Sequence, residues 1–236
     1  MRILDIDLDL FLADCCPLAE RGSRPELAGH EPWCENEVIK FLECNCGLST
    51  RRPVPGMIFE THDKALYFWK MLMDRGKLNA PFHVTHADAH SDLGIGYPGP
   101  GFVLYNVLPK RPDLRPDPEY YADQHKLDEA NYLLFAIAFR WISSLDNIRN
   151  PLSRPDIPRI LFPDDAEHIR LSSLTSSLFE NVNGIEPSVP FRVYDDWKTY
   201  TCDGNFDFMS VAISPRYSPA EADRLLPVIS RYMNEL

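Results

Sequence analysis

"RILDIDLDLF", residues 2–11, alternates Ile and Leu with Asp, a pattern typical of a β-strand. It predicts a strand from Arg2 to about Asp9, with one apolar face and one face that carries Asp5, Asp7 and Asp9. Like charges on one face are costly unless a positive group lies between them. "HADAHSDL", residues 86–93, repeats this pattern of ionisable side chains at a strand end. The two stretches therefore predict a bound cation.

Strand-like and helix-like segments alternate along the rest of the chain. Further strands are expected at residues 54–60, 81–90, 159–162, 191–194 and 207–214, and helices at 35–46, 64–75, 123–145 and 172–180. A last helix is expected after Ser218 as N-cap, with Pro219 in its first position and Glu221 completing a capping box. Residues 94–101 and 109–118, rich in Gly and Pro, are expected as loops. This order favours an α/β fold with a mainly parallel sheet covered on both faces.

Composition narrows the class of protein. The 236 residues are 44% hydrophobic, so we expect one globular domain spanning 1–236. The formal net charge of −11 argues against a nucleic-acid partner. No apolar run reaches membrane-spanning length, and three aspartates stand where a signal peptide would be apolar, so we expect a cytoplasmic protein without membrane contact. The six cysteines lack paired metal-knuckle spacing and are expected as free thiols.

Polar side chains gather at the expected carboxyl ends of three strands, in "DIDLD" (5–9), "ETHD" (60–63) and "HADAHSD" (86–92). Ligands bind beyond these ends in parallel sheets. Carboxylates with imidazoles and no thiolate suit Mn²⁺, Fe²⁺, Zn²⁺ or Co²⁺, and a bridging carboxylate lets two ions lie about 3.5–4 Å apart. A lone aspartate at a strand end is more often a cap or turn residue, so the argument depends on the clustering.

Three of these motifs resemble those of one enzyme superfamily. "DAHSD" (88–92) resembles the D-A-H-x-D signature of the ureohydrolases, such as arginases and agmatinases, and of deacetylases on the same fold. "DLDLF" (7–11) is similar to their D-V-D-V-F segment, and "THDKAL" (61–66) to their D-H-S-x-A segment. The D-x-D strand comes late in ordinary arginases and early here. This order, with "FETHDKALYFW" (59–69) and "ISPRYSP" (213–219), resembles the peptide arginases, which convert arginine to ornithine in ribosomally made precursor peptides.

The resemblance implies a fold, a metal centre and a reaction. The fold would be an arginase-like three-layer α/β/α sandwich with a permuted strand order. One Mn²⁺ would be held by His62, Asp88, Asp92 and Asp7, and a second by Asp88, His90, Asp7 and Asp9, with Asp88 and Asp7 bridging. Asp5 would be an acceptor behind the ligands. The substrate would be an arginine-containing precursor peptide, hydrolysed to ornithine and urea, and a homo-oligomer is left open.

Two departures from the family leave roles to assign. Arginases carry a proton-transferring His beyond D-A-H-x-D, but "GIGYPGPGFVLYN" (94–106) has none, which leaves Asp92 and His86 as catalytic candidates. Arginases also bind the guanidinium with a Glu on a late strand, where "VAISP" places Ala212. Glu60 is our first choice for this substrate-binding role, because it lies on the same strand face as His62. A buried salt bridge or a helix cap is its alternative role.

Other hydrolase classes share single features with this chain. An N-terminal D-x-D strand also presents the nucleophile of haloacid dehalogenase-type phosphatases, although that class gives "DAHSD" no role. The His62-Asp63 dipeptide occurs in metal phosphohydrolases. A deacetylase on the arginase-like fold would need one Zn²⁺, agmatinase is a small-molecule alternative, and a binding module would have lost the metal.

Overall fold

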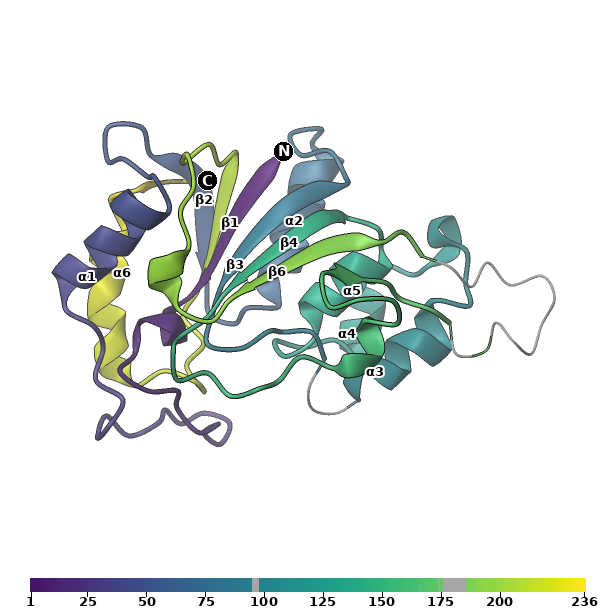
Figure 1. The fold of residues 1–236 in the computed structure, drawn as a ribbon, viewed down its shortest axis with the longest axis horizontal. Helices are drawn as coiled ribbons and strands as arrows, with labels where there is room; N and C mark the ends of the chain where they lie inside the picture. Colours follow the sequence, from purple (N-terminus) through teal and green to yellow (C-terminus); the bar gives the residue numbers. More distant parts are fainter. Residues whose placement is uncertain (95–97, 174, 176–185) are drawn as a thin grey trace.

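One sheet organises the residues that the structure, a computed structural model, describes: 1–94, 98–173, 175 and 186–236 (Figure 1). Within these ranges the sheet has eight strands in the order β5-β6-β4-β3-β1-β7-β2-β8, and all neighbours are parallel except β5 and β6. The strands are β1 Arg2–Asp7, β2 Val54–Phe59, β3 Phe82–Ala87, β4 Ile142–Ile148, β5 His168–Ile169, β6 Val189–Tyr194, β7 Phe208–Ala212 and β8 Met233–Glu235. The predicted α/β class with a mainly parallel sheet is confirmed.

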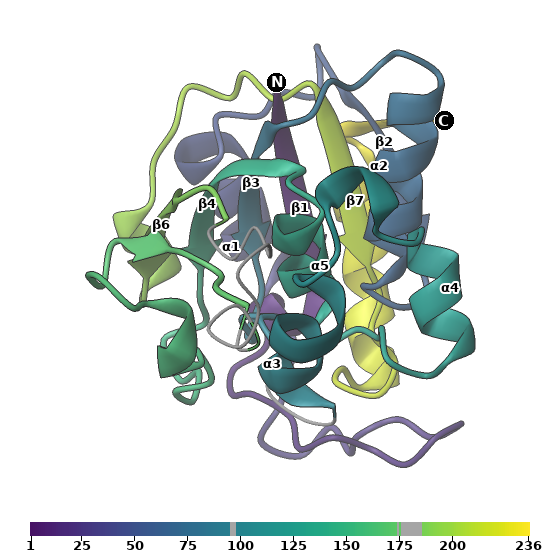
Figure 2. The ribbon, with the colours of Figure 1, turned by 90° about the vertical axis from the view of Figure 1, so that its right-hand side faces the viewer.

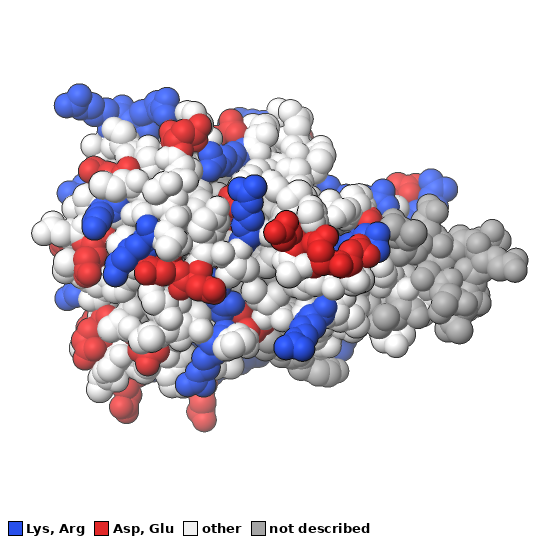
Figure 3. Space-filling view, in the orientation of Figure 1, with Lys and Arg blue, Asp and Glu red and all other residues white. Residues whose placement is uncertain are grey.

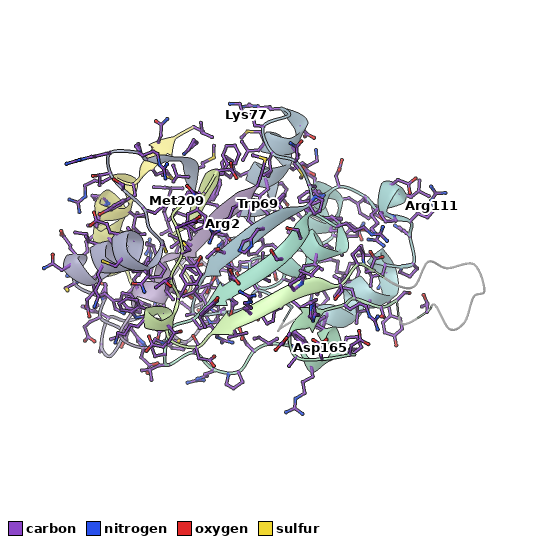
Figure 4. The ribbon with its side chains drawn as sticks, turned by 45° about the horizontal axis from the view of Figure 1, so that its top comes forward. Arg2, Trp69, Lys77, Arg111, Asp165 and Met209 are labelled. Carbon is purple, nitrogen blue, oxygen red and sulfur yellow. The ribbon has the colours of Figure 1, made fainter. Side chains whose placement is uncertain are left out.

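Helices cover both faces of the sheet (Figures 1 and 2). They are α1 Glu35–Lys40, α2 Lys64–Asp74, α3 Gly99–Phe102, α4 Pro118–Asp123, α5 Tyr132–Ala138 and α6 Leu226–Ser230. One apolar layer joins α2 and α5 to the sheet, and the other joins α1 and α6. Trp69 of the first layer and Met209 of the second are labelled in Figure 4. The chain therefore forms three layers, helix–sheet–helix.

Strand β1 lies in the middle of the sheet, between β3 and β7. Because alternate residues point to opposite faces, Leu4 and Ile6 enter the layer of α1 and α6, whereas Ile3 enters the layer of α2 and α5. Asp5 shares the face of Ile3 and is fully buried. The strand ends at Asp7, not at Asp9 as predicted, because the chain turns into a 3-10 helix at Leu8–Phe11.

The helix predicted at 123–145 is wrong over most of its length. Apart from Asp123, which ends α4, only Tyr132–Ala138 is α-helical in that range, and Ile142–Ile148 is strand β4. Arg140, with φ of 62°, reverses the chain between the two elements. All seven residues of α5 are buried. A uniformly apolar helix that is followed by further apolar residues, Phe139 and Trp141, has no periodicity that marks its end.

Other expected elements have mixed outcomes. The helices at 35–46 and 64–75 and the strands at 54–60, 81–90, 191–194 and 207–214 are confirmed within a few residues; α1 continues as a π-turn through Phe41–Asn45. Residues 159–162 form a 3-10 turn instead of a strand. The helix expected at 172–180 falls largely on residues outside the described ranges, as does part of the loop at 94–101, where α3 already begins at Gly99.

The chain's last elements also differ from the prediction. A 3-10 helix at Ala220–Leu225 precedes α6, and Pro219 occupies its N-cap position. The Ser218 hydroxyl donates to Ile213 O at 2.7 Å, so the expected capping box does not form. Strand β8 follows α6 and pairs with β2, so β7 is not the final strand.

Surface charges are mixed on the face drawn in Figure 3, where Lys and Arg alternate with Asp and Glu. The six cysteines are free thiols, as predicted. Within the described residues no helix is both long and apolar enough to cross a membrane.

Candidate metal centre

The six predicted metal ligands meet at the carboxyl edge of the sheet. Asp7 ends β1, Asp9 lies in the turn after it, and His62 follows β2. The other three come directly after β3. All six line one cavity of about 180 Å³, whose full lining is Asp7, Asp9, His62, Asp88, His90, Ser91, Asp92, Glu129, Ala130, Asp156, Ser214 and Tyr217. They meet because β1, β2 and β3 run parallel, so their carboxyl ends share an edge of the sheet.

Backbone amides fix the carboxylates in place. Asp7 Oδ1 accepts from Asp9 N at 3.0 Å, which caps the 3-10 turn. Asp9 Oδ1 accepts from Ala89 N at 3.1 Å, and Asp88 Oδ1 from His90 N at 2.6 Å. The turns after β1 and β3 are therefore tied together by their acidic side chains. Asp7 therefore does cap a helical turn, as a lone aspartate often does, but only its Oδ1 takes part; its Oδ2 faces His62.

The first ligand group surrounds one nitrogen of His62. Its Nδ1 lies 2.9 Å from Asp88 Oδ2, 3.1 Å from Asp7 Oδ2 and 3.3 Å from Asp92 Oδ2. These side chains are almost completely buried. Three carboxylates around one imidazole nitrogen exceed what one N–H can satisfy. These four residues are the set that the resemblance implied for one ion.

The second ligand group surrounds His90. Its Nδ1 lies 2.8 Å from Asp9 Oδ2 and 3.5 Å from Asp88 Oδ1. Asp88 thus contacts His62 with one oxygen and His90 with the other. This is the arrangement expected of a carboxylate shared by two neighbouring sites, and it brings together three of the four residues of the second implied set, Asp88, His90 and Asp9.

The carboxylates of the cluster stabilise positive charge on the groups around them. Burial raises the pKa of Asp92 to about 7, and the neighbouring Asp88 adds to the rise. Burial alone would lower the pKa of His62 and of His90, but the carboxylates around them raise both pKa values. His86 Nε2 is also buried, with no hydrogen-bond partner among the described residues. Oxygen and nitrogen donors with excess negative charge fit divalent cations such as Mn²⁺.

Asp5 lies behind the cluster and does not line the cavity. One of its oxygens, Oδ2, is 3.2 Å from His62 Nε2 and 3.1 Å from His86 Nδ1, and it accepts from the Tyr132 hydroxyl. The other accepts from the Ser210 hydroxyl of β7. Burial would raise the pKa of Asp5, but His62 and His86 hold it well below the usual value. Asp5 is placed to orient His62, as an acceptor behind the ligands should be.

The two candidate proton carriers occupy different positions. Asp92 lines the cavity and has φ of 51°, a left-handed conformation unusual for a residue other than glycine. Ser214, which also lines the cavity and donates to Asp7, has φ of 46°. Strain of this kind is concentrated at functional sites. His86 is fully buried and does not line the cavity, so it cannot touch a substrate there.

Glu60 is not where a guanidinium-binding residue should be. Its side chain is exposed and is not part of the cavity wall. The chain leaves the β-strand at Phe59, so the strand alternation that would place Glu60 beside His62 no longer holds. The position of Glu60 therefore does not support the substrate-binding role expected of it.

Glu129 is the acid that sequence reasoning missed. It lines the cavity, and its Oε1 pairs with Arg216 Nη1 at 3.2 Å. Burial raises its pKa, and Arg216 opposes that rise. Glu129 lies in a turn before α5, inside the range predicted as a continuous helix, so nothing in the sequence marked it.

Asp156 and Tyr217 complete the described wall. Asp156 Oδ2 accepts from Ser91 N at 2.6 Å, and its Oδ1 pairs with Arg149 at 2.8 Å. The Tyr217 ring contacts that of His90, with centroids 5.0 Å apart. The cavity therefore has a carboxylate-rich base and a wall that mixes acidic and aromatic side chains.

Comparisons of the chain with protein-family models, curated proteins and solved structures gave no match. The function is therefore argued from the geometry of the cluster and from the motifs that form it.

Proposed function

We propose that the protein is a binuclear manganese hydrolase that converts arginine residues of a precursor peptide to ornithine and releases urea. The fold would then be an arginase-like α/β/α sandwich with a permuted strand order. The observation that carries the proposal is the position of Asp88, which contacts His62 through one oxygen and His90 through the other. Two donor sets that share a carboxylate fit two ions better than one.

The residues of the two ligand groups would bind the two ions. His62, Asp92, Asp7 and Asp88 would hold one Mn²⁺, and His90, Asp9, Asp7 and Asp88 the other. When bound, such ions lower the pKa of a water molecule so that it becomes a nucleophile at neutral pH. Asp5 would keep His62 in the orientation that presents Nδ1 to the ligand group.

The remaining cavity residues would handle the substrate. Glu129 would pair with the guanidinium, which is a planar cation suited to a carboxylate. Water oxygen joins the guanidinium carbon, the bond from that carbon to the side-chain nitrogen breaks, and this nitrogen takes a proton to become the ornithine amine. Asp92 is the acid in the cavity that we assign to this proton transfer.

Rival functions find less support in the described geometry. Asp63 accepts from Thr61 and pairs with Lys64 at 2.7 Å, away from the cavity, so the His62-Asp63 dipeptide does not act as a unit. A one-zinc deacetylase leaves the Asp9–His90 pair without a role. An agmatinase would differ from the proposed enzyme only in its substrate, so a comparison of urea release from agmatine and from peptides distinguishes the two.

The decisive experiment measures urea from manganese-loaded protein with arginine-containing peptides, free arginine and agmatine. We expect urea from peptides, with a peptide mass loss equal to urea minus water. Asp88→Asn should abolish both manganese binding and urea release, whereas the matched variant Glu60→Gln should retain both. Full activity of Asp88→Asn, or release of phosphate or acetate from the rivals' substrates, would contradict the proposal.

A further inference from the structure

Among the described residues, no strand pairs with the outer edge of β6 where this strand approaches the metal cavity. On its inner side β6 pairs with β4 over Phe191–Tyr194, but on its outer side β5 pairs only with Val189 and Pro190. Arg149 N donates to Tyr194 O on the β4 side, and Phe191 N donates to Glu167 O on the β5 side. Because this direction alternates along a strand, the N–H and C=O of Val193 face outward.

Three surface depressions meet at Val193. One is lined by Arg149, Ser153, Pro155, Asp156, Ile157, Val193 and Asp195, and the second by Ile157, Arg159, Phe162, Asp165, Ala166, Phe191 and Val193. The third follows β5 and β6 from Ala166 to Tyr194. Figure 4 shows Asp165 beside the outer margin of β6. Shared residues join the depressions into one groove along the strand edge.

The groove has an apolar floor at the edge of a sheet. Ile157, Phe162 and Phe191 line it, and the Val193 side chain is 38% exposed. An open strand edge with alternating side-chain pockets is the surface to which an extended polypeptide adds as a further strand.

The groove adjoins the metal cavity at Asp156. This residue lines both the cavity and the nearest depression. Its two oxygens bind Ser91 on the cavity side and Arg149 on the groove side. A chain lying along β6 would therefore run towards the carboxyl end of the sheet, where the cavity opens.

We propose that an extended segment of the polypeptide substrate adds to the outer edge of β6 at Val193 and so delivers its arginine to the cavity. This inference rests on the proposed function, since it takes the occupant from the reaction. The position of the groove beside the cavity favours the substrate over a second copy of this chain, whose edge would have no reason to lie next to the metal centre.

Backbone methylation of the substrate tests the inference without altering the protein. The probe is a nine-residue peptide with one central arginine flanked by valine and threonine, N-methylated at one position at a time. Alternate residues of an added strand point to β6, so methylation at those positions should raise KM about tenfold and methylation between them should not. Equal KM at every position would overturn the proposal.

A variant tests the same edge from the protein side. Val193→Pro removes the outward N–H but no hydrogen bond to β4, whereas Val193→Thr keeps the N–H and the shape. We expect Val193→Pro to raise KM about tenfold for the nine-residue peptide, with unchanged manganese content and unchanged kinetics on acetyl-arginine N-methylamide. If Val193→Pro does not fold by circular dichroism, the methylated peptides decide alone.

Two measurements distinguish an error in the proposed peptide binding at β6 from an error in the proposed reaction. Acetyl-arginine N-methylamide reports the reaction without the edge, and fluorescence anisotropy of a labelled nine-residue peptide reports the edge without the reaction. Peptide binding that Val193→Pro leaves unchanged overturns the inference. So does a dimer that sedimentation shows to dissociate in Val193→Pro, because the edge would then join two copies of the chain.

Discussion

Asp88 is the residue on which the proposed metal centre depends most, and it was predicted from the sequence. D-A-H-x-D predicted that Asp88, His90 and Asp92 act together, and the structure brings them to one cavity with His62. The pairing of Asp88 with Asp7 was predicted from the resemblance, because spacing alone cannot show that β1 and β3 are neighbours. Glu129 could not be predicted, since it reaches the cavity through a turn whose position depends on how α5 packs.

Replacing Glu129 tests its assignment to the substrate cation. Glu129→Gln removes the charge and keeps the shape, so we expect KM for arginine peptides to rise about tenfold or more. Manganese content should not change, because Glu129 is not in either ligand group. Steady-state kinetics measure the effect, with Glu60→Gln as the control. An unchanged KM would show that another group binds the cation.

Ser210 tests the support behind the ligands. Its hydroxyl donates to the buried Asp5 across the β1–β7 pair, so Ser210→Ala leaves a buried carboxylate oxygen without that donor. We expect a loss of about 1–3 kcal/mol in the free energy of unfolding, measured by urea denaturation. Ser23→Ala, at an exposed hydroxyl, should change it by less than about 0.5 kcal/mol. Equal effects of the two variants would refute the assigned role of Ser210.

At the scale of elements, alternation of polar and apolar residues predicted secondary structure well, whereas a uniformly apolar segment did not. The pattern of "RILDIDLDLF" correctly predicted a strand that carries Asp5 and Asp7 on one face, although the strand ends at Asp7 and Asp9 lies in the turn after it. The almost uniformly apolar residues 132–142 hid the boundary between α5 and strand β4, since a helix buried on every side has no polar face to set its period. The missed strand links β3 to β6 and is needed for the complete sheet.

Two glycines allow the segment after α1 to approach the loop before β7. Gly47 and Gly204 both have positive φ, and a Cβ on Gly204 would lie only 2.0 Å from Gly47 O. We expect Gly204→Ala to lower the free energy of unfolding by more than about 2 kcal/mol. Gly76→Ala is the control, because Gly76 has a similar φ of 65° but open space around it, so only the backbone cost of about 1 kcal/mol applies. Urea denaturation of both variants measures the difference; equal losses would refute the close contact.

At the scale of the molecule, protons would compete with the proposed metal ions for the same cluster. Despite burial, which acts in the opposite direction, carboxylates raise the pKa values of His62, His86 and His90. A raised pKa in the folded state stabilises the metal-free protein below the unfolded value of about 6.5, and this stabilisation is lost as pH rises. Metal binding needs neutral imidazoles and has the reverse dependence.

The two pH dependences together give a measurable outcome. The difference in Tm between manganese-loaded and metal-free protein should widen from pH 6 to pH 8, since the metal-free form weakens as the metal binds more tightly. Thermal unfolding with and without a chelator measures it, and Asp88→Asn should show no metal-dependent difference at either pH. A constant difference in the parent protein would argue against an ion in this cluster.

The central place of β1 also sets the order in which the site can be assembled. Asp5 meets His86 and Ser210, which lie 81 and 205 residues further along the chain. Contacts that distant close slowly, because the intervening loops must lose their freedom first. During synthesis on the ribosome, β1 is complete long before β7, which carries Ser210, has been made. The support that Ser210 gives to Asp5 is thus a late contact, whereas the six proposed metal ligands all lie within the first 92 residues.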